Sequence, residues 1–152
     1  MHFRTDCAEQ TEIIGERLAR ALLKSQKRAF VAMRGEMGVG KTAFTRGFAR
    51  ALGISGVKSP TYTVVNEHRG DARLFHYDMY RIEDEDDLYS TGFDDYLASD
   101  GYIVAEWSEK IPDLIPDDAI FVTIGRSPDG ECARDIEIDF PDGRYEDVYS
   151  CI

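Results

Sequence analysis

The feature that most constrains this chain is a glycine-rich loop set between an apolar run and an amphipathic segment. The loop, Gly35-x-x-x-x-Gly40-Lys41-Thr42, is a full match to the phosphate-binding P-loop pattern. Its glycines let the backbone curl so that successive N–H groups converge on an anion, and a helix that begins near Lys41 adds its positive N-terminal end. The apolar run at residues 29–33 supplies the strand that precedes such a loop. The sequence therefore predicts an α/β fold that holds phosphate groups on this loop.

The P-loop predicts ATP and Mg2+ as ligands. The Lys41 ammonium is expected to reach the β and γ phosphate oxygens, and the Thr42 hydroxyl is expected to bind Mg2+. Guanine specificity normally needs an Asn-Lys-x-Asp or Thr-Lys-x-Asp segment, and the sequence contains neither, which favours adenine. The residues expected to contact the nucleotide in this stretch are Glu36, Met37, Gly38, Val39, Gly40, Lys41, Thr42 and Ala43.

A Mg2+ ion bound to phosphate also needs a carboxylate, which usually lies at the end of a hydrophobic strand beside the loop. Two predicted strands end in an acid: residues 74–78 end at Asp78, and residues 102–106 end at Glu106. The second run is more continuously apolar and is therefore favoured as the central strand. The pattern favours Glu106 as the metal ligand and leaves Asp78 open as the alternative.

The remaining pattern predicts one domain over residues 1–152, a P-loop NTPase-like mixed β-sheet flanked by helices in three layers. Apolar residues recur at helical spacing over residues 7–24, and Asp6 with Glu9 has the spacing of a capping box. A second helix is expected to follow the P-loop and to end at Gly53. Two hairpins make the sheet mixed in direction. Their expected strands are residues 64–67 with 74–78, and residues 119–124 with 135–140.

Charge is distributed unevenly along the chain, whose net charge is −11. Residues 28–58, which surround the P-loop, carry six Lys or Arg against one acid. Residues 83–100 carry eight acids and no Lys or Arg, and such a stretch repels a nucleic-acid backbone, so unassisted binding to DNA or RNA is not expected. We interpret it as the solvated face of one or two short helices, with a docking surface for a basic partner as the alternative. The expected buried residues of this stretch are Leu88, Phe93, Tyr96 and Leu97.

Other sequence features exclude several classes of protein. No apolar run approaches the roughly 20 residues needed to cross a bilayer. The first residues lack an apolar signal core, so a cytoplasmic location is expected. The three cysteines are far apart and are expected to be reduced thiols. His2, His68 and His76 are isolated and are expected on the surface or in the hairpin, without a role in metal binding.

Five segments occur together in an order that is typical of one family. They are residues 35–42, 58–63, 76–81, 92–96 and 105–107. In order and approximate spacing they resemble the TsaE family, the small ATPase of bacterial tRNA threonylcarbamoyladenosine biosynthesis. The Ser-Pro-Thr-Tyr-Thr segment and the later Glu-Trp pair make the resemblance specific, which the P-loop alone would not.

The resemblance implies a P-loop fold with ATP and Mg2+, in which Thr42 and Glu106 bind the metal. It implies that Asp78 lies near the γ phosphate, where its carboxylate would orient water or a metal-bound water. It also assigns Trp107 to the site, although a lone tryptophan is more often part of the core, and it assigns Thr11 to a contact with the base. The switch loop that would sense the γ phosphate consists of Ser59, Pro60, Thr61, Tyr62 and Thr63.

By this resemblance the protein would hydrolyse ATP while bound to the TsaB–TsaD pair, and would reset that complex between turnovers without touching the tRNA base. One departure from the family is Ala43, which replaces a second Thr whose hydroxyl could meet the α phosphate, so the affinity is expected to be lower. Two rival functions stay open. One is a small-molecule P-loop kinase that transfers phosphate to a metabolite, and the other is a nucleotide-dependent binding switch that scarcely hydrolyses ATP.

Overall fold

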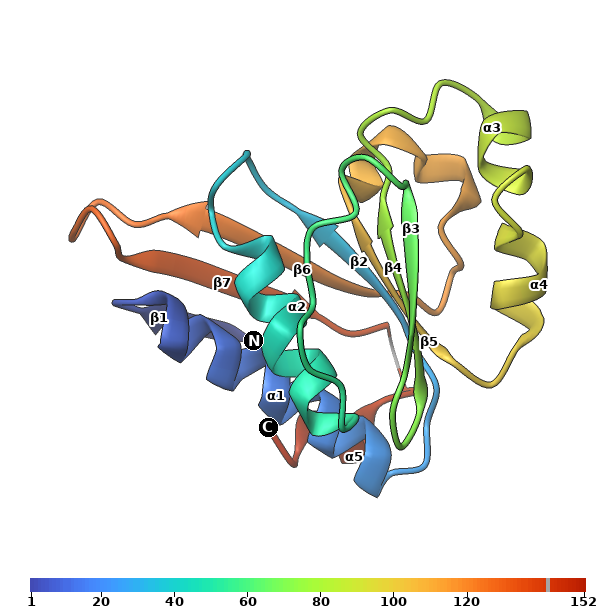
Figure 1. Ribbon diagram of the computed structural model, residues 1–152. Coiled ribbons are helices and arrows are strands. Elements are labelled where there is room, and N and C mark those ends of the chain that lie inside the picture. The colour runs from blue at the N-terminus through green and yellow to red at the C-terminus, as the bar shows by residue number, and fades with distance from the viewer. Residues whose placement is uncertain (142) are drawn as a thin grey trace.

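A seven-stranded mixed sheet organises the computed structural model, which describes residues 1–141 and 143–152 (Figure 1). The strand order is β1-β7-β6-β2-β5-β4-β3. The strands are β1 (His2–Thr5), β2 (Phe30–Arg34), β3 (Val65–Arg69), β4 (Arg73–Asp78), β5 (Tyr102–Glu106), β6 (Ile120–Arg126) and β7 (Arg134–Asp139). The helices are α1 (Ala8–Lys24), α2 (Lys41–Ala51), α3 (Glu85–Tyr89), α4 (Phe93–Ala98) and α5 (Glu146–Tyr149), with 3-10 turns η1 (Ser108–Lys110) and η2 (Pro112–Leu114).

The middle of the sheet is parallel and buried on both faces. Strand β2 pairs in parallel with β5 on one side and with β6 on the other, and β5 pairs in parallel with β4. Alternate residues of a strand point to opposite faces, so Val31 and Met33 of β2 pack on one side while Phe30 and Ala32 pack on the other. All four are apolar, as a strand covered on both faces requires.

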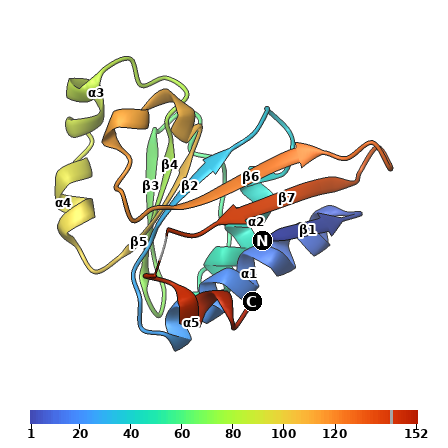
Figure 2. The same ribbon diagram turned by 180° about the vertical axis from the view of Figure 1, so that it is seen from behind.

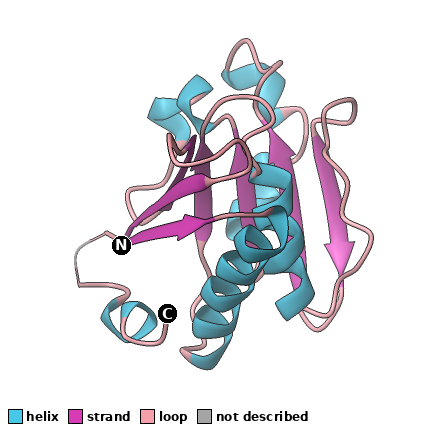
Figure 3. Cartoon of the chain, turned by 90° about the vertical axis from the view of Figure 1, so that its left-hand side faces the viewer, coloured by secondary structure: helices cyan, strands magenta, loops and turns pink. Residues whose placement is uncertain are grey.

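Helices cover both faces of the sheet and make the fold three-layered. Helices α1 and α2 lie over one face together with α5, while α3, α4 and the 3-10 turns lie over the other (Figures 1 and 2). Figure 3 shows the two long helices of this layer in front of the strands. The α1–α2 core contains Leu18, Leu22, Phe44 and Phe48. The α3–α4 core contains Phe75, Tyr77, Leu88 and Phe93. The expected mixed, three-layered α/β sheet is thus confirmed.

Two glycines allow α1 and α2 to pack backbone against backbone. A Cβ atom built on Gly47 would lie 1.8 Å from the carbonyl oxygen of Glu12, and one built on Gly15 would lie 2.1 Å from that of Phe44. No side chain fits at either distance. Helix α2 begins at the P-loop. Its close packing against α1 therefore fixes the direction in which the N-terminus of α2 points toward the loop.

Several expectations are corrected by the structure. Strand β1 and helix α5 were not expected, and both have only four residues, too few to give a clear period. The capping box of Asp6 and Glu9 is wrong: the N-cap is Cys7, and the Asp6 N–H donates to the side chain of Gln10. Leu97, expected to be buried, is 39% exposed and lies in the last turn of α4.

The described part of the chain contains no helix that is both long and apolar enough to cross a membrane.

Candidate nucleotide and metal site

The P-loop adopts the curled conformation that its glycines predict. It lies between the end of β2 and the start of α2, and Gly35, Gly38 and Gly40 all have positive φ angles, of 140°, 77° and 114°. Other residues rarely adopt these angles. Gly35 is also restricted by space, because a Cβ atom there would lie 2.3 Å from the carbonyl oxygen of Ile124. The backbone of β6 therefore supports the first turn of the loop.

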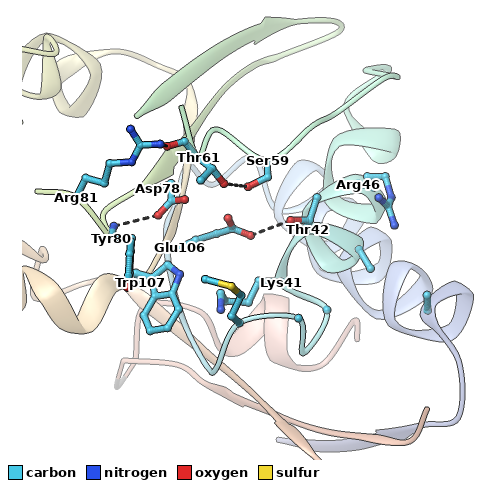
Figure 4. A pocket seen from close by; sticks show the side chains of 15 residues that line it. Lys41, Thr42, Arg46, Ser59, Thr61, Asp78, Tyr80, Arg81, Glu106 and Trp107 are labelled. Atoms are coloured by element: carbon cyan, nitrogen blue, oxygen red, sulfur yellow. Dashed lines mark hydrogen bonds between the residues drawn. The ribbon is translucent and has the colours of Figure 1, made fainter. Parts of the chain in front are cut away.

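A cavity of about 490 Å³ opens beside this loop (Figure 4). The loop and the first turn of α2 contribute Met37, Gly38, Gly40, Lys41, Thr42 and Ala43 to its lining. The opposite side is formed by the ends of β4 and β5 and by the segment after α2. The residues there include Ser59, Thr61, Asp78, Glu106 and Trp107. The structure thus brings together P-loop, strand-end acids and part of the expected switch loop.

Lys41 is held close to the loop. Its Nζ donates to the carbonyl oxygens of Gly35, at 2.6 Å, and Glu36, at 2.9 Å. Nζ also lies 4.4 Å from the centre of the Trp107 ring. Burial lowers the pKa of this ammonium, and the charges of nearby acids, Glu106 foremost, only partly offset the effect. A buried ammonium of this kind gains from additional negative charge, which phosphate would supply.

The two strand-end acids lie side by side. Strands β4 and β5 are parallel, and Asp78 is paired in register with Glu106. Both side chains are buried. The Thr42 hydroxyl donates to Oε1 of Glu106 at 3.3 Å, whereas Oδ1 of Asp78 accepts from the Tyr80 N–H at 3.0 Å (Figure 4). Glu106 is therefore the acid that faces the hydroxyl of the P-loop helix.

The donor set fits a Mg2+ ion that is shared with phosphate. A hydroxyl and a buried carboxylate are hard oxygen ligands, and Mg2+ in phosphate sites usually takes one or two protein oxygens and completes its shell with phosphate and water. The described residues contain no cluster of three or more His, Cys, Asp or Glu that could hold a metal by themselves. Thr42 and Glu106 therefore fit a nucleotide-bound metal rather than a separate protein metal centre.

Trp107 also faces the cavity, although it follows Glu106 directly. Successive residues of a strand point to opposite faces, but Trp107 has left-handed backbone angles, with φ of 56° and ψ of 40°. The strand ends there and the indole turns to the same cavity as the Glu106 carboxylate. The Tyr80 ring packs against it at 5.1 Å between ring centres.

The expected switch loop is split between the cavity and the solvent. Ser59 and Thr61 line the cavity, and their hydroxyls lie 2.7 Å apart. Arg81 donates to the Thr61 carbonyl oxygen and so joins this loop to the end of β4. Tyr62 is 89% exposed, and neither it nor Pro60 or Thr63 lines the cavity.

Three other predicted contacts also lie outside the lining. The Thr11 side chain is buried behind Gly40. Its hydroxyl forms a hydrogen bond with the Thr5 hydroxyl at 2.9 Å, so it is not directed into the cavity. Glu36 is exposed at the tip of the loop. The Val39 side chain is buried, and its carbonyl oxygen accepts from Nε of Arg134 at 2.9 Å.

Sequence reasoning missed four residues that line the cavity: Ala8, Arg46, Tyr80 and Arg81. Arg46 follows Thr42 by four residues and so lies on the same face of α2, a spacing that could have found it. Its guanidinium pairs with Glu12 of α1 at 3.1 Å. Arg81 and Tyr80 follow the strand-end acid directly. His76, expected on the surface or in the hairpin, lies in hairpin strand β4 but is fully buried beside Glu106.

Comparison with known proteins gives a consistent set of similarities. The family model for "Threonylcarbamoyl adenosine biosynthesis protein TsaE" matches residues 5–136. Two proteins named tRNA threonylcarbamoyladenosine biosynthesis protein TsaE are similar to the chain. The Haemophilus influenzae protein is 39% identical over 82% of this chain and 79% of its own length. The Bacillus subtilis protein is 36% identical over 96% of this chain and 89% of its own length. A crystal structure of Bacillus subtilis YdiB superposes with a TM-score of 0.78 and 28% identity, covering 99% of this chain and 91% of that one.

Proposed function

The chain belongs to the TsaE family of tRNA threonylcarbamoyladenosine biosynthesis proteins, and we propose that it is an ATPase whose site is the cavity beside the P-loop. The single observation that carries the proposal is the contact of Thr42 with Glu106, 3.3 Å apart, across a cavity that the P-loop borders. This contact joins the first turn of α2 to the end of β5, the buried strand next to β2. A metal held there would lie where the P-loop directs a nucleotide's terminal phosphates.

The roles of the side chains follow from their positions. Lys41, already at the loop, would bind the β and γ phosphate oxygens. Thr42 and Glu106 would hold Mg2+, which when bound neutralises charge on the phosphates. Asp78, beside Glu106 and fixed by the Tyr80 N–H, would orient the attacking water. Trp107 would close the side of the cavity nearest to Lys41.

A γ phosphate could be sensed by the loop that carries Ser59 and Thr61. Their hydroxyls face the cavity and bond to each other at 2.7 Å, and a phosphate oxygen could replace one partner of this pair. The same loop is tied to Arg81 at the end of β4. ATP and ADP would then differ in the contacts that they offer to this loop, which is the condition for a nucleotide switch.

The protein is proposed to act on a TsaB–TsaD complex. The names of its relatives place those proteins in tRNA threonylcarbamoyladenosine biosynthesis. The chain's net charge of −11 disfavours direct contact with tRNA and suits a protein partner instead. In this reading ATP hydrolysis resets the complex between turnovers.

The deciding experiment measures phosphate release from Mg-ATP by this protein alone and after addition of TsaB and TsaD from the same source. Turnover should be low alone and should rise with both partners, and a Glu106→Gln variant should lose it in both conditions. Phosphorylation of a metabolite without partners would instead identify a kinase. ATP binding without any partner-stimulated hydrolysis would identify a binding switch.

A further inference from the structure

The His76 side chain is a polar group buried inside the sheet. It lies in β4 and is fully inaccessible to solvent. Neither ring nitrogen has a hydrogen-bond partner among the residues that the structure describes. Leaving such a group unpaired in an apolar core destabilises the fold, so a purely space-filling residue at this position would be better apolar.

The neighbours of His76 show what the imidazole faces. His76 is paired in register with Val104 of β5, on the face that packs against the α1–α2 core. Two residues further along both strands, Asp78 and Glu106 point to the same face. Nε2 of His76 lies 3.7 Å from Oε2 of Glu106. This is longer than a hydrogen bond but leaves no room for a water molecule between the two atoms.

The two oxygens of the Glu106 carboxylate are therefore directed to different partners. Oε1 accepts from the Thr42 hydroxyl at 3.3 Å, and Oε2 faces Nε2 of His76. When one oxygen of a carboxylate is held by a neighbouring side chain, the other oxygen points in a fixed direction. This division is typical of metal-binding side chains, whose orientation is set by partners that do not touch the metal.

We propose that His76 is a positioning residue for the metal-binding carboxylate of Glu106. In the nucleotide-bound protein the imidazole donates from Nε2 to Oε2, which holds Oε1 toward Thr42, where the metal would bind. The inference rests on the proposed Mg-nucleotide site and adds a partner to it. Hydrogen bonds of this kind are often long without ligand and shorten when the site is loaded.

The test measures how much Mg2+ strengthens nucleotide binding, because His76 acts only through the metal acid. The dissociation constant of ADP is measured by calorimetry with Mg2+ and without it, and the ratio of the two values is the readout. His76→Leu removes the donor and should lower this ratio roughly tenfold or more. His76→Gln keeps an N–H near the position of Nε2 and should retain most of the ratio. ADP binding without Mg2+ should stay as in the wild type.

Thermal stability, measured beside ADP binding, distinguishes a positioning role of His76 from a packing role. If His76 is needed only for the packing of its neighbours, His76→Leu should lower thermal stability and weaken ADP binding equally with and without Mg2+. Under the proposal His76→Leu is at least as stable as the wild type, because an unpaired polar group has been removed from the core. His68→Leu is the control, since His68 lies on the neighbouring strand β3 and is paired with Leu74. Leu74 is paired with Tyr102, four residues before Glu106. The His68→Leu variant should leave the ratio unchanged.

The outcomes also distinguish this inference from the proposed site. A wild-type protein that binds ADP equally well with and without Mg2+ would overturn the metal site and His76 with it. A Mg2+-dependent wild type with an unchanged ratio in His76→Leu would overturn only the role of His76. If the leucine variant does not fold, His76→Met offers a more adaptable side chain without a donor and must show the same loss.

Discussion

At the scale of single residues, Lys41 is the side chain on which phosphate binding should depend most. Its ammonium is the cation that the loop holds at the cavity wall. Lys41→Ala should weaken ATP binding roughly 10- to 100-fold, the usual range for a lost hydrogen bond to a charged group, and should abolish turnover. Lys24→Ala, at the exposed end of α1, is the charge-matched control and should bind normally. Wild-type hydrolysis by Lys41→Ala would remove the loop from the site.

Trp107 gives the proposed nucleotide site a direct fluorescence signal, because it is the chain's single tryptophan. Its ring lines the cavity near Lys41 and Tyr80. Emission should therefore change on addition of Mg-ATP, and ATP and ADP should give different end values if Ser59 and Thr61 respond to the γ phosphate. A flat titration, with binding shown independently by calorimetry, would exclude Trp107 from the site.

Individual residues also show what the sequence could reveal and what it could not. The motif located Lys41 and Thr42, and the apolar run before Glu106 identified it as the end of a buried strand, because both signals are local. The strand at the centre of the sheet is β2 and not, as expected, the strand that ends at Glu106. The roles of Lys41, Thr42 and Glu106 stay predictions. The burial of His76 and the left-handed turn at Trp107 depend on neighbours from other strands, so no local pattern indicated either.

At the scale of elements, the β6–β7 hairpin braces the P-loop. When backbone N–H groups converge on a ligand, the carbonyl groups point outward and need donors of their own. Arg134 of β7 donates to the carbonyl oxygen of Val39 in the loop, at 2.9 Å, and to those of Glu131 and Ala133 in its own hairpin. The guanidinium thus joins the hairpin end to the loop.

Replacing Arg134 should therefore loosen the loop without touching the metal ligands. Arg134→Ala should raise the dissociation constant of ADP by about tenfold, the effect of roughly one lost hydrogen bond, and by the same factor with and without Mg2+. The matched control is Arg126→Ala, since Arg126 is exposed and lies opposite Arg134 in the register. A selective loss of Mg2+ dependence would contradict the bracing role.

The P-loop helix and the two hairpins were more predictable than the short elements β1 and α5. The P-loop helix and the two hairpins follow from apolar periodicity, turn residues and the Gly53 stop, and the structure contains all of them. Strand β1 and helix α5 were missed because each is held mainly by distant contacts. The N-terminal amine donates to the Ile138 carbonyl oxygen, and Tyr145 beside α5 donates to that of Asp118. Such pairings have no local signature.

At the scale of the whole molecule, both cores share the strands β2, β4 and β5, so the chain should unfold as one unit. Trp107 packs against the α3–α4 core, whereas far-ultraviolet circular dichroism reports mainly the long helices α1 and α2. The two signals should give coincident urea transitions. Separate midpoints would show that the two cores are independent and would contradict the predicted single domain.

The burial of β2 on both faces has a consequence for how the protein exchanges its amide hydrogens with solvent. Strands β1 and β3 form the two edges of the sheet, where opening is local and deuterium enters first. Strand β2 lies inside, between β6 and β5, and its amides should exchange only when the whole sheet opens. The P-loop follows β2 directly, so the strand that anchors the phosphate site should remain closed even while the edge strands open.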